Sequence, residues 1–475
     1  MRSVPSEPER YLSGTIARFV HEFCFDRLPP AVIAIARQHL LDTVGCCLGA
    51  MDLDTSRALG AWLVSEGGAE QATAIGIDRR LPAAQAAFVN GLLARSLEYD
   101  DMAMPDLHPS GVIVPVVLAV GEWQGATGAE LLIAIALGLE LCIRIGRAGY
   151  DADTRTSRFL QRGQDASAIC GAVAGAAVAA RLLGLDTSRI ADAIAIAVSL
   201  ASGSLEANRS GGTIKRFQSG WAAKSAVQAA CLANAGVDGP AEAFEGRYGF
   251  YRCFLDGAFD AAVLAEGLGE HWEIFSLRFK PYPSNYYTHA GIDAALALSR
   301  HGIKPEQVRS AELAVATPML RTMGEPLARK QAPRSAYEAK FSGPYTVAAA
   351  MIGGTGLGLG IDDFTDPLVR EPRRVALMQR IAVVADPRCD VVFPDQAPAV
   401  LAVVTAAGDR VLEQVMVNRG GPDRPLDDVE LAAKFEDCAK RALPPHVMGS
   451  LRKAIENLPA AGAVTLAELF GVRER

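Results

Sequence analysis

The feature that most constrains the fold is a change of hydrophobic pattern near residue 275. Before it, segments such as "TIARFVHEFCF" and "QAAFVNGLLARSLEY" carry apolar residues at i, i+3 and i+4, which is typical of helices. After it, "SAELAVATP", "RIAVVADP" and "AVLAVVTAAGDRVLEQVMV" are β-branched or alternating and bounded by Pro, Gly or Asp, which predicts strands. A helical pattern returns in "DVELAAKFEDCAKRAL" and "HVMGSLRKAIENL".

These patterns predict a mostly α protein, with a large all-helical domain and a smaller α+β domain inserted before the C-terminal helices. We place the helical domain at 1–275, the α+β lid domain at 276–420, and the helices that return to the first domain at 421–475. A chain of 475 residues, 50% of them hydrophobic, is too long for one simple core. Only 7% are aromatic and small residues abound, which favours closely packed helices over a β-sandwich.

Composition argues against several classes of protein. The net charge is −7 and there is no strong basic run, so we expect no binding to nucleic acid. The nine cysteines form no CxxC pair and mostly have apolar neighbours, as reduced thiols in a cytoplasmic protein do. The longest uncharged stretch, 341–361, contains Pro344 and the run "GGTGLGLG", which makes a poor membrane span. We expect a soluble, cytoplasmic protein.

Common cofactor and metal motifs are missing from the sequence. It contains no GxxxxGK[ST], no GxGxxG, no GxSxG and no HExxH, and it has only seven histidines. We therefore expect chemistry that uses neither a cofactor nor a metal.

The stretch Tyr99–Gly111, "YDDMAMPDLHPSG", places acids, prolines and a histidine between two apolar segments. In one interpretation it is a solvated loop in which Asp106 caps, and Pro109 opens, the next helix. In the other, a carboxylate and His108 meet at a helix–loop–helix corner and transfer a proton. The residues alone favour the solvated loop.

Further polar stretches also lead into apolar helices. They are "SGGTIKRFQSGWAAKS" with Lys215 and Arg216, "RFKPYPSNYYTHAGIDA" with Lys280, Tyr282, Asn285 and His289, "EAKFSGPYTVAAA" with Lys340, and "RFLQRGQDASAICG" with Arg158, Arg162 and Asp165. Each alone is consistent with ordinary exposed or satisfied side chains. Together they place cations near helix N-termini, where backbone N–H groups also bind anions.

Four ordered blocks resemble the MmgE/PrpD family. They are "RSLEYDDM…HPSGVIVPVVLAVGE", "KRFQSGWAAKSAVQAACLANAGVDGPAEAFEG", "KPYPSNYYTHAGIDA" and "EAKFSGPYTVAAA". The resemblance covers nearly the whole chain. It implies a large helical domain with a smaller α+β lid, a homodimer, and dehydratase, decarboxylase or epimerase activity on small polycarboxylates.

The polar stretches and the resemblance together indicate the site residues. The catalytic residues are expected to be Glu98, Asp101, His108, Asp165 and Lys215. The substrate-binding residues are expected to be Asp100, Met102, Arg158, Arg216, Lys280, Tyr282, Asn285, His289 and Lys340. Three positions depart from the family pattern: Met102 replaces a threonine, Asp165 a histidine, and Asn285 an acid/base residue.

The implied function is a cofactor-independent lyase, a dehydratase or decarboxylase, that acts on a small di- or tricarboxylate. Negative charge would develop on a carbon next to a carboxylate, and cations with N–H donors would stabilise it. An alternative is an epimerase or isomerase of a dicarboxylate such as iminodisuccinate, which only removes and returns a proton. Asp165 and Asn285 tilt the interpretation toward this alternative. A third is a non-catalytic carboxylate-binding relative.

Overall fold

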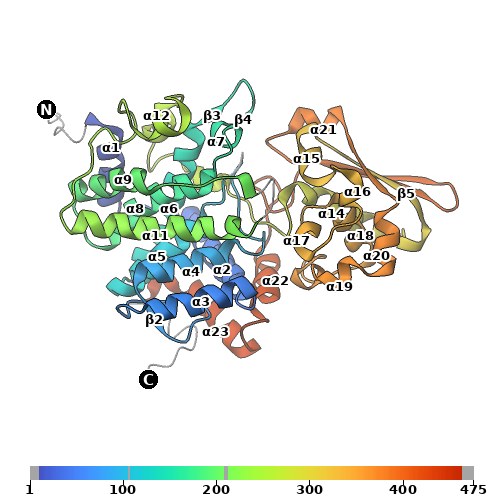
Figure 1. Ribbon diagram of the computed structural model, residues 1–475, viewed down its shortest axis with the longest axis horizontal. Helices are drawn as coiled ribbons and strands as arrows, with labels where there is room; N and C mark the ends of the chain where they lie inside the picture. The colour runs from blue at the N-terminus through green and yellow to red at the C-terminus, as the bar shows by residue number, and fades with distance from the viewer. Residues whose placement is uncertain (1–9, 105–106, 208–211, 463–475) are drawn as a thin grey trace. The chain divides into compact units, whose positions relative to one another are not determined.

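The computed structural model describes residues 10–104, 107–207 and 212–462, and the chain divides into two compact units (Figure 1). Unit 1 comprises Met1–Ser96, Asp100–Leu277 and Ala439–Arg475. Unit 2 comprises Leu97–Tyr99 and Arg278–Cys438.

Unit 1 is built almost entirely of helices. They are α1 (Leu12–Glu22), α2 (Pro30–Gly49), α3 (Asp54–Glu66), α4 (Ala83–Arg95), α5 (Ser110–Gln124), α6 (Gly128–Ala148), α7 (Arg158–Gln161), α8 (Ala166–Leu182), α9 (Thr187–Leu200), α11 (Ile214–Asn234), α12 (Phe250–Leu255), α13 (Ala261–Ala265) and α23 (Pro445–Glu456), with the 3-10 turns η2 (Phe25–Arg27), η3 (Glu273–Ser276) and η8 (Leu458–Ala460). Two short antiparallel hairpins pair β1 (Ala72–Thr73) with β2 (Arg80–Leu81) and β3 (Tyr150–Asp151) with β4 (Thr156–Ser157).

Small residues let the helices of unit 1 approach closely. Helix α8 is buried from Ala166 through Ala180 and packs against α5, α6, α9 and α11 (Figure 1). Where α4 crosses α11, a Cβ on Gly91 would lie 2.8 Å from the Cα of Gly220, so the two backbones touch. The predicted close packing of small-residue helices is confirmed.

Unit 2 contains a four-stranded sheet and short helices. Its strands are β5 (Val308–Val315), β6 (Ile381–Ala385), β7 (Ala399–Thr405) and β8 (Arg410–Val415), in the order β6-β5-β7-β8. Its helices and turns are η4 (Tyr286–Thr288), α14 (His289–Arg300), η5 (Pro305–Gln307), η6 (Thr317–Met319), α15 (Leu320–Met323), α16 (Leu327–Lys330), α17 (Ala336–Ala339), α18 (Gly343–Ile352), η7 (Ile361–Asp363), α19 (Asp366–Val369), α20 (Pro372–Met378), α21 (Pro387–Val392) and α22 (Asp428–Ala439).

The sheet follows the predicted strand pattern. Strand β7 is buried at nearly every position because it lies inside the sheet, whereas the edge strand β8 alternates in exposure. Strand β5 pairs in parallel with β6 and antiparallel with β7, with Leu313 opposite both Val383 and Leu401. Helix α14 packs on β7 and β8 and against α18. The predicted fold class, a helical part and a smaller α+β part, is confirmed.

Unit 2 ends later than the boundary placed at residue 420, because it includes α22. Lys434 on this helix donates to the carbonyl of Tyr99 at 2.8 Å, and Asp437 Oδ2 accepts from the amide of Ile361 at 3.2 Å. Leu431 joins a buried cluster with Phe279. The hydrophobic period shows that this segment is helical, but only its contacts show which unit it belongs to.

One helix among the described residues, α2, is long and apolar enough by length and composition alone to cross a membrane. Of its most apolar window, 61% is buried within the protein, as in a core helix.

Replacement of Gly220 by alanine tests the close crossing of α4 and α11. The new Cβ would lie 2.3 Å from the carbonyl oxygen of Phe88, so the helices must separate. We expect a loss of about 1–3 kcal/mol in the free energy of unfolding, measured by denaturant titration. Gly449→Ala in α23 is the control, since its added Cβ would meet no atom within 4 Å among the described residues beyond its own stretch of helix. It should be neutral or stabilising, and an equal loss in both variants would contradict the interpretation.

Candidate functional site

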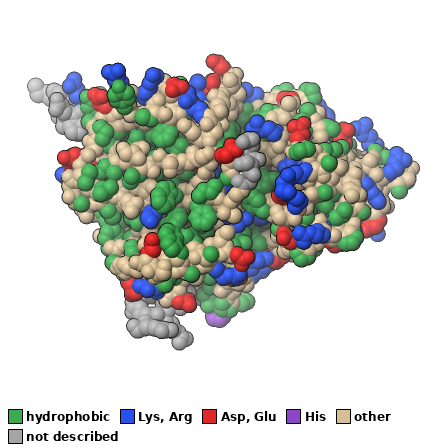
Figure 2. All heavy atoms as spheres, in the orientation of Figure 1, with side chains coloured by type: hydrophobic (Ala, Val, Ile, Leu, Met, Phe, Trp, Pro, Cys, Tyr) green, Lys and Arg blue, Asp and Glu red, His purple; other side chains and the backbone are tan. Residues whose placement is uncertain are grey.

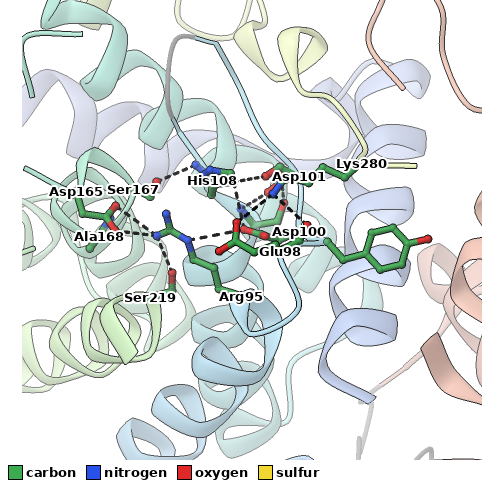
Figure 3. A network of polar contacts seen from close by, with 12 residues as sticks. Arg95, Glu98, Asp100, Asp101, His108, Asp165, Ser167, Ala168, Ser219 and Lys280 are labelled. Carbon is green, nitrogen blue, oxygen red and sulfur yellow. Dashed lines mark hydrogen bonds and ion pairs between the residues drawn. The ribbon is translucent and has the colours of Figure 1, made fainter. Parts of the chain in front are cut away.

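The centre of the candidate site in unit 1 is the guanidinium of Arg95, the last residue of α4 (Figure 3). Its Nη1 donates to Asp165 Oδ2 at 3.0 Å and to Ser219 Oγ at 3.2 Å. Its Nε lies 3.9 Å from Asp100 Oδ2. Arg95, Asp100 and Asp165 are all at least 95% buried. Arg95 therefore stands between two buried carboxylates.

Asp165 both caps α8 and pairs with Arg95. Its Oδ1 accepts from the amide of Ala168 at 3.2 Å, as an N-cap residue does. Burial alone would raise the pKa of Asp165, but Arg95, the Ala168 amide and His108 outweigh it and hold the pKa below its ordinary value of 3.8. Asp165 is therefore an anion at physiological pH.

His108 is oriented through one ring nitrogen. Its Nδ1 lies 2.7 Å from the carbonyl oxygen of Asp101 and 3.2 Å from Asp100 Oδ2. The His108 amide donates to Ser167 Oγ at 2.9 Å, which ties the loop to the first turn of α8 (Figure 3). Because both neighbours of Nδ1 are acceptors, Nδ1 carries the proton in the neutral ring and Nε2 is left as a basic lone pair. The side chain is 13% exposed.

The carboxylate of Asp101 accepts hydrogen bonds from the first residue of α5. Its Oδ2 accepts from Ser110 Oγ at 2.5 Å and lies 3.1 Å from Nδ1 of His39 on α2. Its Oδ1 accepts from the Ser110 amide at 3.3 Å. Asp101 thus holds the turn on which His108 stands. Asp106, expected as a helix cap, lies outside the described residues, and α5 begins directly after Pro109 as predicted.

Lys215 lies in the first turn of α11 and is buried. It precedes Ser219 by four residues, so both side chains lie on the same face of the helix. Ser219 contacts Arg95, which directs this face toward the Arg95 cluster. Arg216, the next residue, is half-buried.

In unit 2, buried lysines surround Leu97–Tyr99. Lys280 Nζ donates to the carbonyl of Glu98 at 3.3 Å and lies 3.9 Å from its Oε2. Lys340 Nζ donates to the carbonyls of Leu97 at 2.7 Å and Pro283 at 2.8 Å. Both lysines, expected to bind substrate, therefore make backbone contacts in the protein itself.

Other expected binding residues of unit 2 have structural partners. The Tyr282 hydroxyl donates to Asp293 Oδ1 at 2.5 Å and accepts from Arg419 at 3.1 Å. Burial, with Asp293 beside it, raises the pKa of Tyr282. Asn285 Oδ1 accepts from the amide of Tyr287 at 3.2 Å and so begins the turn η4.

His289 is completely buried, with Nε2 3.2 Å from the carbonyl oxygen of Ser284. Burial, reinforced by the charge of Lys280, lowers the pKa of His289 to about 3. Its imidazole is therefore neutral at physiological pH and supplies no positive charge to a substrate carboxylate.

Two further expected residues of unit 1 have no place in the Arg95 cluster. Arg158 pairs with Asp151 at 3.1 Å and is partly exposed. Met102 follows Asp101 and is buried. Within the described ranges, no group of three or more His, Cys, Asp or Glu side chains is arranged to hold a metal ion.

The sequence analysis missed Arg95, His39, Ser219 and Lys434. A signal existed for two of them. Arg95 ends an apolar helix just before the acidic stretch, and His39 stands with Asp42 inside the apolar segment of α2. Ser219 and Lys434 gave none, because a serine or lysine on a helix is ordinarily exposed.

Comparison with known proteins accounts for both parts of the chain. The MmgE/PrpD N-terminal domain matches residues 14–261, and the MmgE/PrpD C-terminal domain matches residues 282–458. Cis-aconitate decarboxylase of Mus musculus is 29% identical over 80% of this chain and 77% of its own length. The Homo sapiens enzyme of the same name is 26% identical over 94% and 92%. The 2-methylcitrate dehydratase of Cupriavidus necator is 27% identical over 86% of each chain. The chain belongs to the MmgE/PrpD family.

Proposed function

We propose that this protein is a lyase that removes carbon dioxide or water from a small di- or tricarboxylate without a cofactor. The observation that carries the proposal is the geometry of His108, whose Nδ1 faces Asp101 O and Asp100 Oδ2, so that Nε2 carries the lone pair of the neutral ring. The relatives support the reaction class, since a decarboxylase and a dehydratase are both lyases.

His108 acts in this scheme as the group that moves a proton. Its Nε2 takes a proton from, or returns one to, the carbon next to a substrate carboxylate. The carboxylate of Asp100, 3.2 Å from Nδ1, stabilises the imidazolium that forms. Asp101 holds the ring through its carbonyl and its contacts with Ser110.

Lys215 binds the carboxylate on which negative charge develops. It lies in the first turn of α11, where the positive end of the helix dipole adds to the attraction for an anion. Its burial strengthens that attraction, because water screens the charge less. Polycarboxylate substrates need such cations before they leave water.

Asp165 serves in this proposal as a fixed counter-ion rather than as a base. Both its oxygens accept hydrogen bonds, from Arg95 and from the amide of Ala168. Its lowered pKa makes it a poor proton acceptor at neutral pH. Glu98, whose Oε2 lies 3.9 Å from Lys280 Nζ, remains a candidate acid or base in unit 2.

A second candidate is an epimerase or isomerase of a dicarboxylate such as iminodisuccinate. Asn285 favours it, because an amide cannot protonate a leaving group and its Oδ1 is engaged by the Tyr287 amide. The epimerase shares the first step with the lyase and needs only the return of the proton.

The homodimer and the cytoplasmic location stay predictions. In favour of a partner surface, α11 exposes Ile214, Trp221 and Leu232, which are 59%, 49% and 41% accessible and share one helix face. Figure 2 shows hydrophobic side chains at the surface of unit 1 where this helix lies. Exposed apolar patches mark interaction sites in many proteins.

Proton NMR in D2O tests the proposed reaction directly. The protein is incubated separately with cis-aconitate, 2-methylcitrate, citrate and iminodisuccinate. New vinyl or methylene signals, with loss of the substrate skeleton, are expected for the lyase. Deuterium incorporation into an unchanged skeleton would establish the epimerase instead. Ligand-induced thermal stabilisation without any product would identify a non-catalytic binder.

Replacement of His108 and Lys215 tests their roles on a substrate that turns over. His108→Gln should lower kcat by about 10²–10⁴-fold, because the proton carrier is lost. Lys215→Met should lower kcat/KM by about tenfold or more through loss of a charge-assisted contact to the carboxylate on which charge develops. His21→Gln and Lys224→Met, outside the cluster, are the controls. Full turnover in both site variants would refute this assignment.

Replacement of Asp165 by asparagine tests the counter-ion role. The buried Arg95 loses its partner charge, so we expect a loss of about 3–5 kcal/mol in the free energy of unfolding at pH 7. Asp186→Asn, at the exposed N-cap of α9, should change little, because asparagine also caps.

The stability difference between wild type and Asp165→Asn should also depend on pH. The folded pKa of Asp165 lies below its ordinary value of 3.8, so its contribution is complete above about pH 4 and is lost as the pH falls through the folded pKa. The stability gap between wild type and Asp165→Asn, measured by denaturant titration, should narrow below about pH 4. A gap independent of pH would contradict the ion pair.

A further inference from the structure

Three successive carbonyls of unit 2 are each bound by a different buried lysine. Lys340 Nζ donates to Leu97 O at 2.7 Å, Lys280 Nζ to Glu98 O at 3.3 Å, and Lys434 Nζ to Tyr99 O at 2.8 Å. These lysines are 7%, 1% and 1% accessible. They come from three separate parts of the chain, so the convergence is a property of the fold. We name Lys280, Lys340 and Lys434 the lysine clamp.

Tyr99 has additional anchors, and so does Lys340, the lysine that binds Leu97. Lys434 Nζ lies 4.3 Å from the centre of the Tyr99 ring, and the Tyr99 hydroxyl donates to Pro281 O at 3.2 Å. Lys340 also donates to Pro283 O at 2.8 Å, and its Nζ lies 4.9 Å from the centre of the Phe364 ring. The Tyr99 end is therefore held by more than one contact, and the lysine that binds the Leu97 end is itself fixed by Pro283 and Phe364.

Glu98, the middle residue, has a backbone conformation that residues other than glycine rarely adopt. Its φ is 57°, in the left-handed region, which costs about 1–3 kcal/mol for such a residue. A conformation of this kind persists only where the surroundings hold it. The lysine clamp provides that restraint, because it binds the carbonyls before, at and after the unusual residue.

The burial of three ammonium groups costs free energy, since each loses its hydration, and so adds little net stability to the loop. What it does provide is a fixed orientation of the backbone of Leu97–Tyr99. The tripeptide contains Glu98 and is followed directly by Asp100, the carboxylate beside His108. Small errors in such positions lower rates strongly, by about 10²-fold for 1 Å.

We propose that Lys340 and Lys434 are positioning residues that, with Lys280, hold the backbone of Leu97–Tyr99 so that the carboxylate of Glu98 keeps one orientation. Lys434 thereby acquires a role in orienting Glu98, and the role of Lys340 is to hold the protein backbone rather than the substrate. The inference rests on the proposed function for its effect on turnover, but not for its effect on the loop.

Lys340→Met and Lys434→Met test the lysine clamp, with Lys330→Met as the matched control. Lys330 is also a partly buried lysine of unit 2 that binds backbone carbonyls, but those of Thr322 at 2.5 Å and Phe341 at 2.9 Å rather than those of Leu97–Tyr99. Each of the three variants loses an ammonium group that donates hydrogen bonds to backbone carbonyls. Only the first two should alter the candidate site.

Hydrogen exchange followed by mass spectrometry gives the readout that needs no substrate. In the wild type, amides of the peptide that spans residues 96–101 should exchange as slowly as those of α14, although the segment is a loop. Lys340→Met and Lys434→Met should accelerate this exchange, and Lys330→Met should not. Rapid exchange in the wild type would overturn the proposal even if the variants do not fold.

Kinetics on a substrate that turns over give the second readout. We expect kcat to fall on the order of 10²-fold in both clamp variants with KM nearly unchanged, because orientation is lost rather than affinity. Lys434→Arg, which keeps a cation over the Tyr99 ring, should recover part of kcat. A raised KM with unchanged kcat in Lys340→Met would show that Lys340 binds substrate and overturn its positioning role.

The two proposals fail in different ways. If the wild type converts none of the test compounds, the proposed function fails, whereas the exchange experiment still decides whether the clamp exists. If the wild type turns over and the clamp variants match it in both kcat and exchange, the clamp fails and the proposed function stands.

Discussion

The guanidinium of Arg95 is buried where three helices of unit 1 meet, and a buried charge needs partners because its removal from water is costly. Asp165 at the start of α8 and Ser219 on α11 provide them. Gly91, one turn before Arg95, touches Gly220, the neighbour of Ser219. The close helix crossing therefore brings Ser219 within reach of Arg95. Packing and electrostatics specify the same arrangement.

The polar groups of the site are held mainly through backbone atoms. His108 is oriented by the carbonyl of Asp101 and by its own amide on Ser167. Lys280, Lys340 and Lys434 act on carbonyls of Leu97–Tyr99. Such contacts fix the path of a loop whatever its side chains are. Side chains such as Glu98 and Asp100 are then directed by the backbone they stand on.

Several residues that were expected to act on the substrate also have, or have instead, a structural role. Asp165 is both a helix cap and the partner of Arg95. Tyr282 and Asn285, expected near the substrate, use their polar atoms within unit 2. His289 is neutral because burial opposes its charge. Residue type alone could not separate these roles, because a hydroxyl, amide or imidazole serves structure and substrate equally well.

The sequence by itself determined the helical and strand segments, the division into a helical and an α+β part, and the residue types available for proton transfer and anion binding. Hydrophobic period and turn residues act over a few positions, and so can be seen without a structure. The tertiary structure decided which polar groups meet: Arg95 with Asp165, Asp101 with His39, and Lys434 with Tyr99. These pairs lie tens to hundreds of residues apart, and only the packing of whole helices brings them together. The loop at Glu98 needed the structure as well, because long-range contacts hold its left-handed backbone where local preference opposes it.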